Sequence, residues 1–167
     1  MLTTARLVLR RWCAADREPF AALNADPEVM AHLPARLSRA ESDAMVDRIE
    51  AHWDAHGFGL AAVEHRGAFL GYCGLTIPSY PLPFAPCVEI GWRFARAAWG
   101  HGYATEAARA ALEYGFARGL PEIVSFTVAA NTRSRAVMER LGMQRDLDGD
   151  FAHPRSDQPH VLYRISR

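Results

Sequence analysis

The stretch WGHGYATEA, from Trp99 to Ala107, places two glycines one residue apart directly before a helical pattern. Glycine costs about 1 kcal/mol relative to alanine inside a helix, so Gly100 and Gly102 mark a bend or a close approach to a ligand. The first amides of a helix have no partner within the helix, and the helix dipole adds partial positive charge there. A loop without bulky side chains at that point is a candidate phosphate site. Two glycines alone also suit an ordinary tight turn, so other residues must decide.

Glu89 is the second candidate for chemistry, in the strand pattern CVEIGWRF that ends just before this loop. Apolar residues alternate along the pattern, and Glu89 and Gly91 fall together on the opposite face. A glycine inside a strand predicts a bulge or a close approach by a ligand or another backbone. Glu89 is therefore either a general base beside a bound ligand or a solvated strand carboxylate, and the pattern alone leaves both open.

A strand, a loop and a helix must position these residues, and the rest of the chain supplies a sheet around them. Alanines at helical spacing after the loop predict a helix that packs closely on this sheet. Ser38 and Glu41 form a capping box that opens another helix, which ends near Gly57. The predicted strands are 6–12, 58–64, 68–77, 87–94, 123–128, 143–151 and 161–165, and the other helical segments begin at Asp16, Asp26 and Asn131, the last closed by Gly142. The order β-α-α-β-β-β-α-β-α-β-β predicts a mixed α/β sheet with helices on its faces.

Bulk composition predicts one globular domain over residues 1–167, with 50% hydrophobic residues. Acidic and basic residues are equal at 19 each, which gives no basic surface for nucleic acid or an anionic membrane. No apolar run reaches the roughly 18 residues of a membrane span, and no secretory leader is evident. The three cysteines are irregularly spaced and are expected to be small buried residues in a reducing compartment. We therefore expect a cytoplasmic protein without nucleic-acid or membrane partners.

Three weaker candidates are interpreted more simply. His52 and His56 have the spacing of a metal pair but no third ligand, which favours a solvated helix face and no metal. Asp146, Asp148 and Asp150 surround a glycine like a calcium loop but lack its distal glutamate, which favours a turn. The proline-rich loop 78–86 is either a connector or a wall of the acceptor site.

Two spaced motifs resemble the GNAT superfamily of acetyl-CoA-dependent N-acetyltransferases. They are EIGW followed by WGHGYATEA, and NTRSRAVMERLGM, which spans residues 131–143. The segment TARLVLR near the start, and His153–Pro154 with His160 to Tyr163 near the end, resemble the branch of ribosomal-protein alanine N-acetyltransferases. The resemblance covers nearly the whole chain.

This resemblance implies the GNAT fold: a mixed, mostly antiparallel sheet of about seven strands with a splay between the central strands, and about four helices. It also implies that acetyl-CoA binds with its pyrophosphate on the amides of Trp99 through Ala104 and its pantetheine arm in the splay. One amide of the preceding strand would then stabilise the thioester oxyanion. The implied cofactor-binding residues are Ile90, Gly91, Trp92, Arg93, Phe94, Trp99, Gly100, His101, Gly102, Tyr103, Ala104, Thr105, Asn131 and Ser134.

Two positions depart from the family pattern. Ala97 stands where an arginine or glutamine usually precedes the first glycine, so Arg96 or Arg133 is expected to supply the missing charge. Met138 stands where many members carry a tyrosine that acts as general acid. Methionine donates no proton, so the acid is Ser134, a water molecule or no group at all. A thiolate whose pKa lies near 8.5, the value for cysteine, leaves largely unaided.

The sequence therefore predicts an enzyme that transfers acetyl from acetyl-CoA to a primary amine by direct attack in a ternary complex. Glu89 is the expected base and Ser134 a candidate acid, and a peptide N-terminal α-amine is the expected acceptor. A small-molecule or antibiotic amine, and a CoA-binding module with little catalysis, remain alternatives. A monomer and a homodimer fit equally well.

Overall fold

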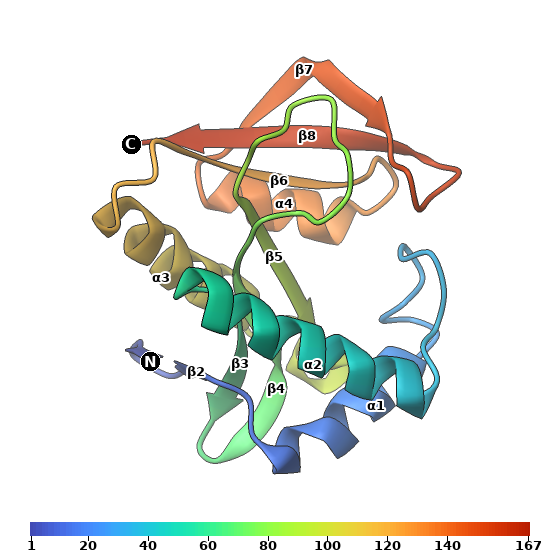
Figure 1. Ribbon diagram of the computed structural model, residues 1–167, viewed down its shortest axis with the longest axis vertical. Coiled ribbons are helices and arrows are strands. Elements are labelled where there is room, and N and C mark those ends of the chain that lie inside the picture. Colours follow the sequence, from blue (N-terminus) through green and yellow to red (C-terminus); the bar gives the residue numbers. More distant parts are fainter.

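The computed structural model describes all residues from Met1 to Arg167 and shows one mixed sheet with helices on both faces (Figure 1). The sheet has eight strands in the order β1-β2-β3-β4-β5-β6-β8-β7. Only the pair β5 and β6 is parallel. The elements are β1 (Leu2–Thr3), β2 (Val8–Arg10), α1 (Arg17–Ala25), α2 (Arg39–His56), β3 (Leu60–His65), β4 (Ala68–Thr76), β5 (Glu89–Phe94), α3 (Tyr103–Ala117), β6 (Glu122–Val128), α4 (Thr132–Arg140), β7 (Gln144–Ala152) and β8 (Pro159–Ser166). Short 3₁₀ turns lie at Ala14–Asp16 and Arg96–Ala98.

This architecture confirms the predicted mixed, mostly antiparallel sheet with four α-helices, and adds one strand to the seven expected. The extra strand is β1, which pairs with β2 through Thr3 and Val8. It was missed because two residues are too short to show the alternation that identifies a strand. The predicted strand 6–12 is correspondingly shorter, because only Val8–Arg10 pairs with β3.

Alternating residues of the central strands divide the core into two parts. Cys73 and Leu75 of β4 face α3 and α4, where the alanines of α3 allow the helix to lie close to the sheet. Tyr72, on the opposite face of β4, packs with residues of α1 and α2 such as Phe20 and Val46. The central strands are thus buried on both faces, which fixes the strand that carries Glu89.

Local sequence signals set the helix ends. The Ser38 side chain accepts a hydrogen bond from the Glu41 amide while the Glu41 carboxylate accepts one from Ser38, as predicted for α2. Gly57 ends the helix with a φ of 72°. Asp26 opens only one helical turn, in which the Met30 amide donates to the Asp26 carbonyl. None of the helices is both long and apolar enough to cross a bilayer.

The three cysteines are all free, and they differ in burial. Cys73 is buried, as expected, whereas Cys13 is exposed at the turn before α1. Cys87 is half-buried, so the expectation of three buried cysteines is met by Cys73 alone. Cys13 is exposed because the chain leaves the sheet before that position.

Candidate active site

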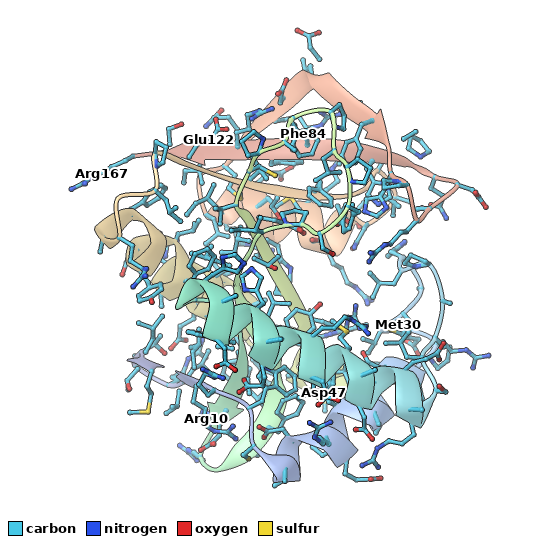
Figure 2. The ribbon with its side chains drawn as sticks, viewed as in Figure 1. Arg10, Met30, Asp47, Phe84, Glu122 and Arg167 are labelled. Carbon is cyan, nitrogen blue, oxygen red and sulfur yellow. The ribbon has the colours of Figure 1, made fainter.

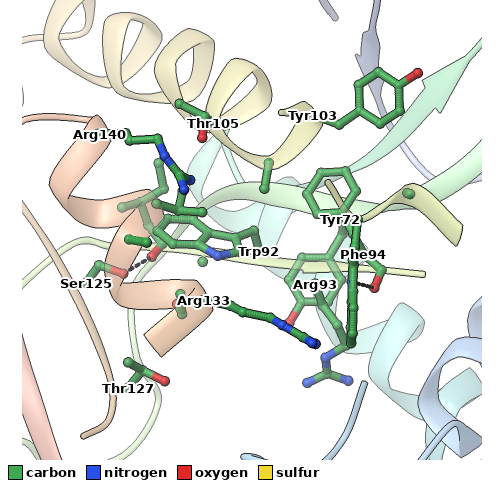
Figure 3. A pocket seen from close by; sticks show the side chains of 18 of the residues that line it. Tyr72, Trp92, Arg93, Phe94, Tyr103, Thr105, Ser125, Thr127, Arg133 and Arg140 are labelled. Atoms are coloured by element: carbon green, nitrogen blue, oxygen red, sulfur yellow. Dashed lines mark hydrogen bonds between the residues drawn. The ribbon is translucent and has the colours of Figure 1, made fainter. Parts of the chain in front are cut away.

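A cleft of about 1950 Å³ opens where β5 and β6 separate, and it is bordered by the start of α3, by α4 and by the connection 26–38 (Figure 3). The cleft gathers all the predicted cofactor and catalytic residues except one. They are Glu89, Ile90, Gly91, Trp92, Arg93, Phe94, Trp99, Gly100, Gly102, Tyr103, Ala104, Thr105, Asn131 and Ser134. His101 is not among the lining residues, and its ring stacks on Tyr103 with centroids 5.5 Å apart, while its amide belongs to the loop before α3.

The parallel strands β5 and β6 pair at one point and then diverge. Glu89 is in register with Val124, and the Val124 amide donates to the Val88 carbonyl at 2.9 Å. The Ser125 hydroxyl, 2.9 Å from the Ile90 carbonyl oxygen, makes the last link across the pair (Figure 3). Since alternate residues of a strand direct their amides to the same side, the Trp92 N–H faces the gap that β6 has left. The gap therefore exposes a backbone donor.

Gly91 lies in a regular ladder, in register with Gly74 of β4, so the expected bulge was wrong. Its other predicted role, a place of close approach, agrees with its surroundings. The Glu89 Oε1 atom would lie 3.8 Å from a Cβ built at Gly91, and nothing else of the chain comes nearer to that position. The glycine therefore leaves open space beside the Glu89 carboxyl group.

The loop before α3 presents unpaired amides in sequence. Gly100 and Gly102 have φ values of 80° and 78°, in the left-handed region that favours glycine. The N–H groups of residues 100–105 have no acceptor in the protein, and pairing resumes where Glu106 donates to the Gly102 carbonyl. Six successive donors at a helix N-terminus form a cradle for an anion. The expectation that the Trp99 amide belongs to this cradle was wrong, since it donates to the Arg96 carbonyl at 3.1 Å.

Arg6 supports this loop from the N-terminal segment, a role that sequence reasoning missed. Its guanidinium donates to the Glu106 carboxylate and to the His101 carbonyl, and it lies 4.7 Å from the centre of the Tyr103 ring. Burial raises the pKa of Glu106, but hydrogen bonds from Thr4 and Arg6 outweigh it and hold the pKa below its usual value. Arg6 therefore joins the loop to the first turn of α3.

Of the two arginines expected to replace the charge missing at Ala97, only Arg133 is free of an acidic partner. Arg96 forms an ion pair with Glu28. The Arg133 side chain extends from α4 into the cleft, with its guanidinium carbon 4.4 Å from the centre of the Trp99 ring (Figure 3). Arg133 thus carries positive charge beside the unpaired amides.

Glu89 is half-buried in the cleft wall and its carboxyl group makes no hydrogen bond with the protein. Burial raises the pKa of Glu89 to about 8. Its position in a cleft and its shifted pKa together favour a functional role over that of a solvated strand carboxylate. Near neutral pH such a group both accepts and releases a proton readily.

On the opposite side of the gap, α4 offers few proton donors. Asn131 caps the helix by accepting from the Ser134 amide and donates to the Thr127 hydroxyl, so its side chain is engaged within the protein. The Ser134 hydroxyl makes no hydrogen bond with the protein and lines the cleft. Met138 is 1% exposed in the core and supplies no proton.

The outer wall of the cleft comes from the connection between α1 and α2, not from the loop 78–86. Glu28, Val29 and Leu33 line the cleft, and no residue of 78–86 does. That loop packs instead against β6 and β7, where the Phe84 ring lies 5.0 Å from Phe151. Figure 2 shows Phe84 near the top of the view, and Met30 lower and to the right, away from it. Of the two interpretations of the proline-rich loop, its contacts favour the connector over a wall of this cleft.

The remaining candidates form no metal site, and no group of three or more histidine, cysteine or acidic residues is placed to hold an ion. His52 is not on a solvated face: Nδ1 bonds with the Phe58 carbonyl and Nε2 accepts from the Ile77 amide. Asp146 and Asp150 lie within β7, where they pair with Arg164 and Arg145, so the predicted turn was wrong. The β7–β8 register is irregular between Asp146 and Phe151, which explains the turn-like composition.

Comparison with known proteins gives a family assignment. A family model described as an acetyltransferase (GNAT) domain matches residues 6–144. The FsC-acetyl coenzyme A-N(2)-transacetylase of Aspergillus fumigatus is 34% identical over 182 aligned positions, covering 99% of this chain and 76% of that protein. A solved acetyltransferase of Agrobacterium tumefaciens is 30% identical with a TM-score of 0.84, covering 99% of this chain and 94% of that one.

A Salmonella typhimurium acetyltransferase described as modifying the N-terminal serine of ribosomal protein L7/L12 has the same fold, with a TM-score of 0.80 and 16% identity over 98% of this chain and 96% of that one. GNAT acetyltransferases use acetyl-CoA, and the cleft described above offers a matching anion cradle and strand gap. The match also favours an enzyme over a binding module. The chain belongs to the GNAT family of N-acetyltransferases.

Proposed function

We propose that this protein transfers the acetyl group of acetyl-CoA to the α-amine of a peptide, by direct attack with both substrates bound. The observation that carries the proposal is the juxtaposition at the strand gap. Glu89, whose pKa is raised to about 8, and the unpaired Trp92 amide both border the place where β5 and β6 separate.

The residues present fit acetyl-CoA. The unpaired amides of residues 100–105 and the guanidinium of Arg133 would hold its phosphates, and β5 would run beside its pantetheine arm. Bound there, acetyl-CoA supplies a thioester whose carbonyl carbon is open to attack. The Trp92 N–H is placed to stabilise the negative charge that develops on the carbonyl oxygen.

Glu89 would accept the proton that the attacking nitrogen must lose, directly or through one water molecule. In the overall reaction a C–N bond forms, the C–S bond breaks, and the sulfur leaves as a thiolate. Because a thiol of this kind titrates near 8.5, the thiolate leaves without a tyrosine to protonate it. The buried Met138 is compatible with this route, and Ser134 on α4 keeps an unengaged hydroxyl in the lining of the cleft.

The pKa of Glu89 also favours an α-amine over a lysine side chain. An α-amine titrates near 7.7–8.0 and lysine near 10.4, so deprotonating lysine at neutral pH costs about 3.4 kcal/mol more. A base with a pKa of about 8 suits the α-amine, which loses its proton more easily than the lysine side chain. The fold likeness to an enzyme described as modifying an N-terminal serine points the same way. A small-molecule amine is the second candidate, favoured by the 34% identity to the Aspergillus transacetylase.

The test compares short peptides that begin with a small residue and carry a free N-terminus with the same peptides blocked at the N-terminus and bearing an internal lysine. We expect faster acetylation of the free N-terminus, with mass spectrometry placing the acetyl group on the α-nitrogen. Acetylation on lysine only, or only on non-peptide amines such as amino sugars, would show that the α-amine assignment is wrong.

A further inference from the structure

Arg93 is a cation in the acceptor half of the cleft that the proposed reaction does not use. Its guanidinium Nη1 donates to the amide oxygen of Asn24, a neutral and fully buried residue at the end of α1. It forms no ion pair, although 13 ion pairs occur elsewhere in the chain. Its Nε is buried without a hydrogen-bond partner, and its Nη2 makes no hydrogen bond with the protein. A half-buried guanidinium without an acid is unusual, because buried charges are normally paired.

The two unpaired nitrogens share one edge of the guanidinium. Nε and Nη2 form the side-on edge that binds both oxygens of a carboxylate at once, while Asn24 occupies the other terminal nitrogen. The guanidinium carbon lies 5.4 Å from the centre of the buried Tyr72 ring, which holds the side chain against the sheet. This edge therefore keeps hydrogen-bonding capacity for a planar anion, although Nε itself is buried and the Tyr72 side chain packs beside the guanidinium.

Arg93 and Glu89 stand on the same face of β5, four residues apart. Their Cα atoms are thus separated by about 13 Å along the strand. Gly91 lies between them on that face and contributes no side chain. The acid that lines the outer wall, Glu28, is paired with Arg96. An open track therefore runs from the proposed base to an unpaired cation.

We propose that the acceptor carries a carboxylate, bound by Arg93, about three extended residues from the amine that Glu89 serves. This proposal rests on the proposed function. An extended chain advances about 3.3–3.6 Å per residue, so the C-terminal carboxylate of a tripeptide spans the track, as does an acidic side chain near the start of a longer peptide. A free amino acid is too short to reach both groups.

The experiment measures kcat/KM for the tripeptide Ser-Ala-Ala as the free acid and as the C-terminal amide, with Ser-Ala-Asp-amide as a third acceptor. We expect the acid to exceed the amide by about 10- to 100-fold, the range of a charge-assisted hydrogen-bonded pair. High activity on Ser-Ala-Asp-amide would identify an acidic side chain as the source of the carboxylate, and low activity would identify the C-terminus. Equal rates on all three peptides would overturn the proposal.

Arg93→Gln should abolish the preference, so that the ratio of kcat/KM for the acid to kcat/KM for the amide falls to about one. Arg93→Lys keeps the charge without the two-nitrogen edge and should restore part of the preference. Arg133→Gln, on the cofactor side, is the matched control and should slow acid and amide equally. If Arg93→Gln instead raises the KM for acetyl-CoA and preserves the acid-to-amide ratio, the cation serves the cofactor and the proposal is wrong.

Failure of the peptide assignment is separable from failure of this proposal. If no peptide is acetylated, 8-aminooctanoate and 8-aminooctanamide repeat the comparison without a peptide. A preference for the carboxylate that Arg93→Gln abolishes would then support the role of Arg93 although the acceptor is not a peptide. Equal rates on these two compounds would overturn it.

Discussion

The two halves of the cleft are built by different means. The cofactor half consists mainly of backbone: six unpaired amides on a glycine loop at the start of α3. The acceptor half consists of side chains from distant segments, with Glu89 and Arg93 on β5, Tyr72 on β4, and the wall 26–38. Backbone donors bind the cofactor that all family members share, whereas side chains can change from one member to another without altering the fold. We therefore expect the cofactor half to indicate the reaction and the acceptor half to set its specificity.

The largest effect is expected from filling the cofactor half. Gly102→Val places a branched side chain at a φ of 78°, strains the loop and obstructs the amides of residues 100–105. We expect CoA binding to weaken by at least about 1000-fold, since several hydrogen bonds to charged phosphate are lost together. Isothermal titration calorimetry measures this directly.

Gly119→Val is the matched control, because Gly119 also has a positive φ, 86°, and a Cβ there would meet nothing within 4 Å. It carries a similar backbone strain far from the loop and should bind CoA normally. Unchanged CoA affinity in a folded Gly102→Val protein would show that the amides of residues 100–105 do not bind the phosphates of CoA.

A smaller effect is expected from loosening the loop while leaving its amides in place. Arg6→Gln removes the link between Glu106 and the His101 carbonyl, and we expect CoA affinity to fall about 10-fold, the effect of one lost charge-assisted hydrogen bond. Arg11→Gln is the control, since Arg11 is similarly exposed, 45% against 44%, and pairs with Glu50 on another face. Equal affinities for the two variants would show that the cradle is rigid without Arg6.

A third effect concerns the stability of the fold and depends on pH. Burial raises the pKa of Glu89 to about 8, so between its unfolded value near 4.5 and pH 8 the folded state holds one more proton at this site than the unfolded state. This group therefore lowers the free energy of unfolding by up to about 1.4 kcal/mol per pH unit as pH rises through that window. Glu89→Gln has no such proton to lose. Urea denaturation should therefore show that the free energy of unfolding of the variant, relative to that of the wild type, increases from pH 5 to 8. If the free energies of unfolding of the two proteins change in parallel with pH, Glu89 is not desolvated in the folded protein.

The difference between the two halves of the cleft also explains which features could be predicted from the sequence. The glycine loop, the capping box of α2 and the alternation around Glu89 are local signals, and each identified its element correctly. The role of the loop 78–86 stayed open between a connector and an acceptor wall, because proline-rich composition marks a stiff loop but does not show what the loop packs against. No local signal pointed to the segment 26–38. Arg6 was missed because its partner, Glu106, lies 100 residues away. Arg93 was expected only as a cofactor-binding residue, because its contact with Asn24, 69 residues away, leaves no local signal. A polar Ser125 in an otherwise apolar strand was the one available signal for the link across the strand gap.

The claim that Glu89 takes the proton from the acceptor amine is tested most directly by the pH dependence of kcat/KM for wild type and Glu89→Gln on a peptide α-amine. With a pKa of about 8, only about a tenth of Glu89 is deprotonated at pH 7, so wild-type activity should rise toward pH 8. The variant should be about 100-fold slower at pH 7 and recover in part at higher pH, as free amine accumulates without help. A Glu89→Gln profile that superimposes on the wild type would contradict the account.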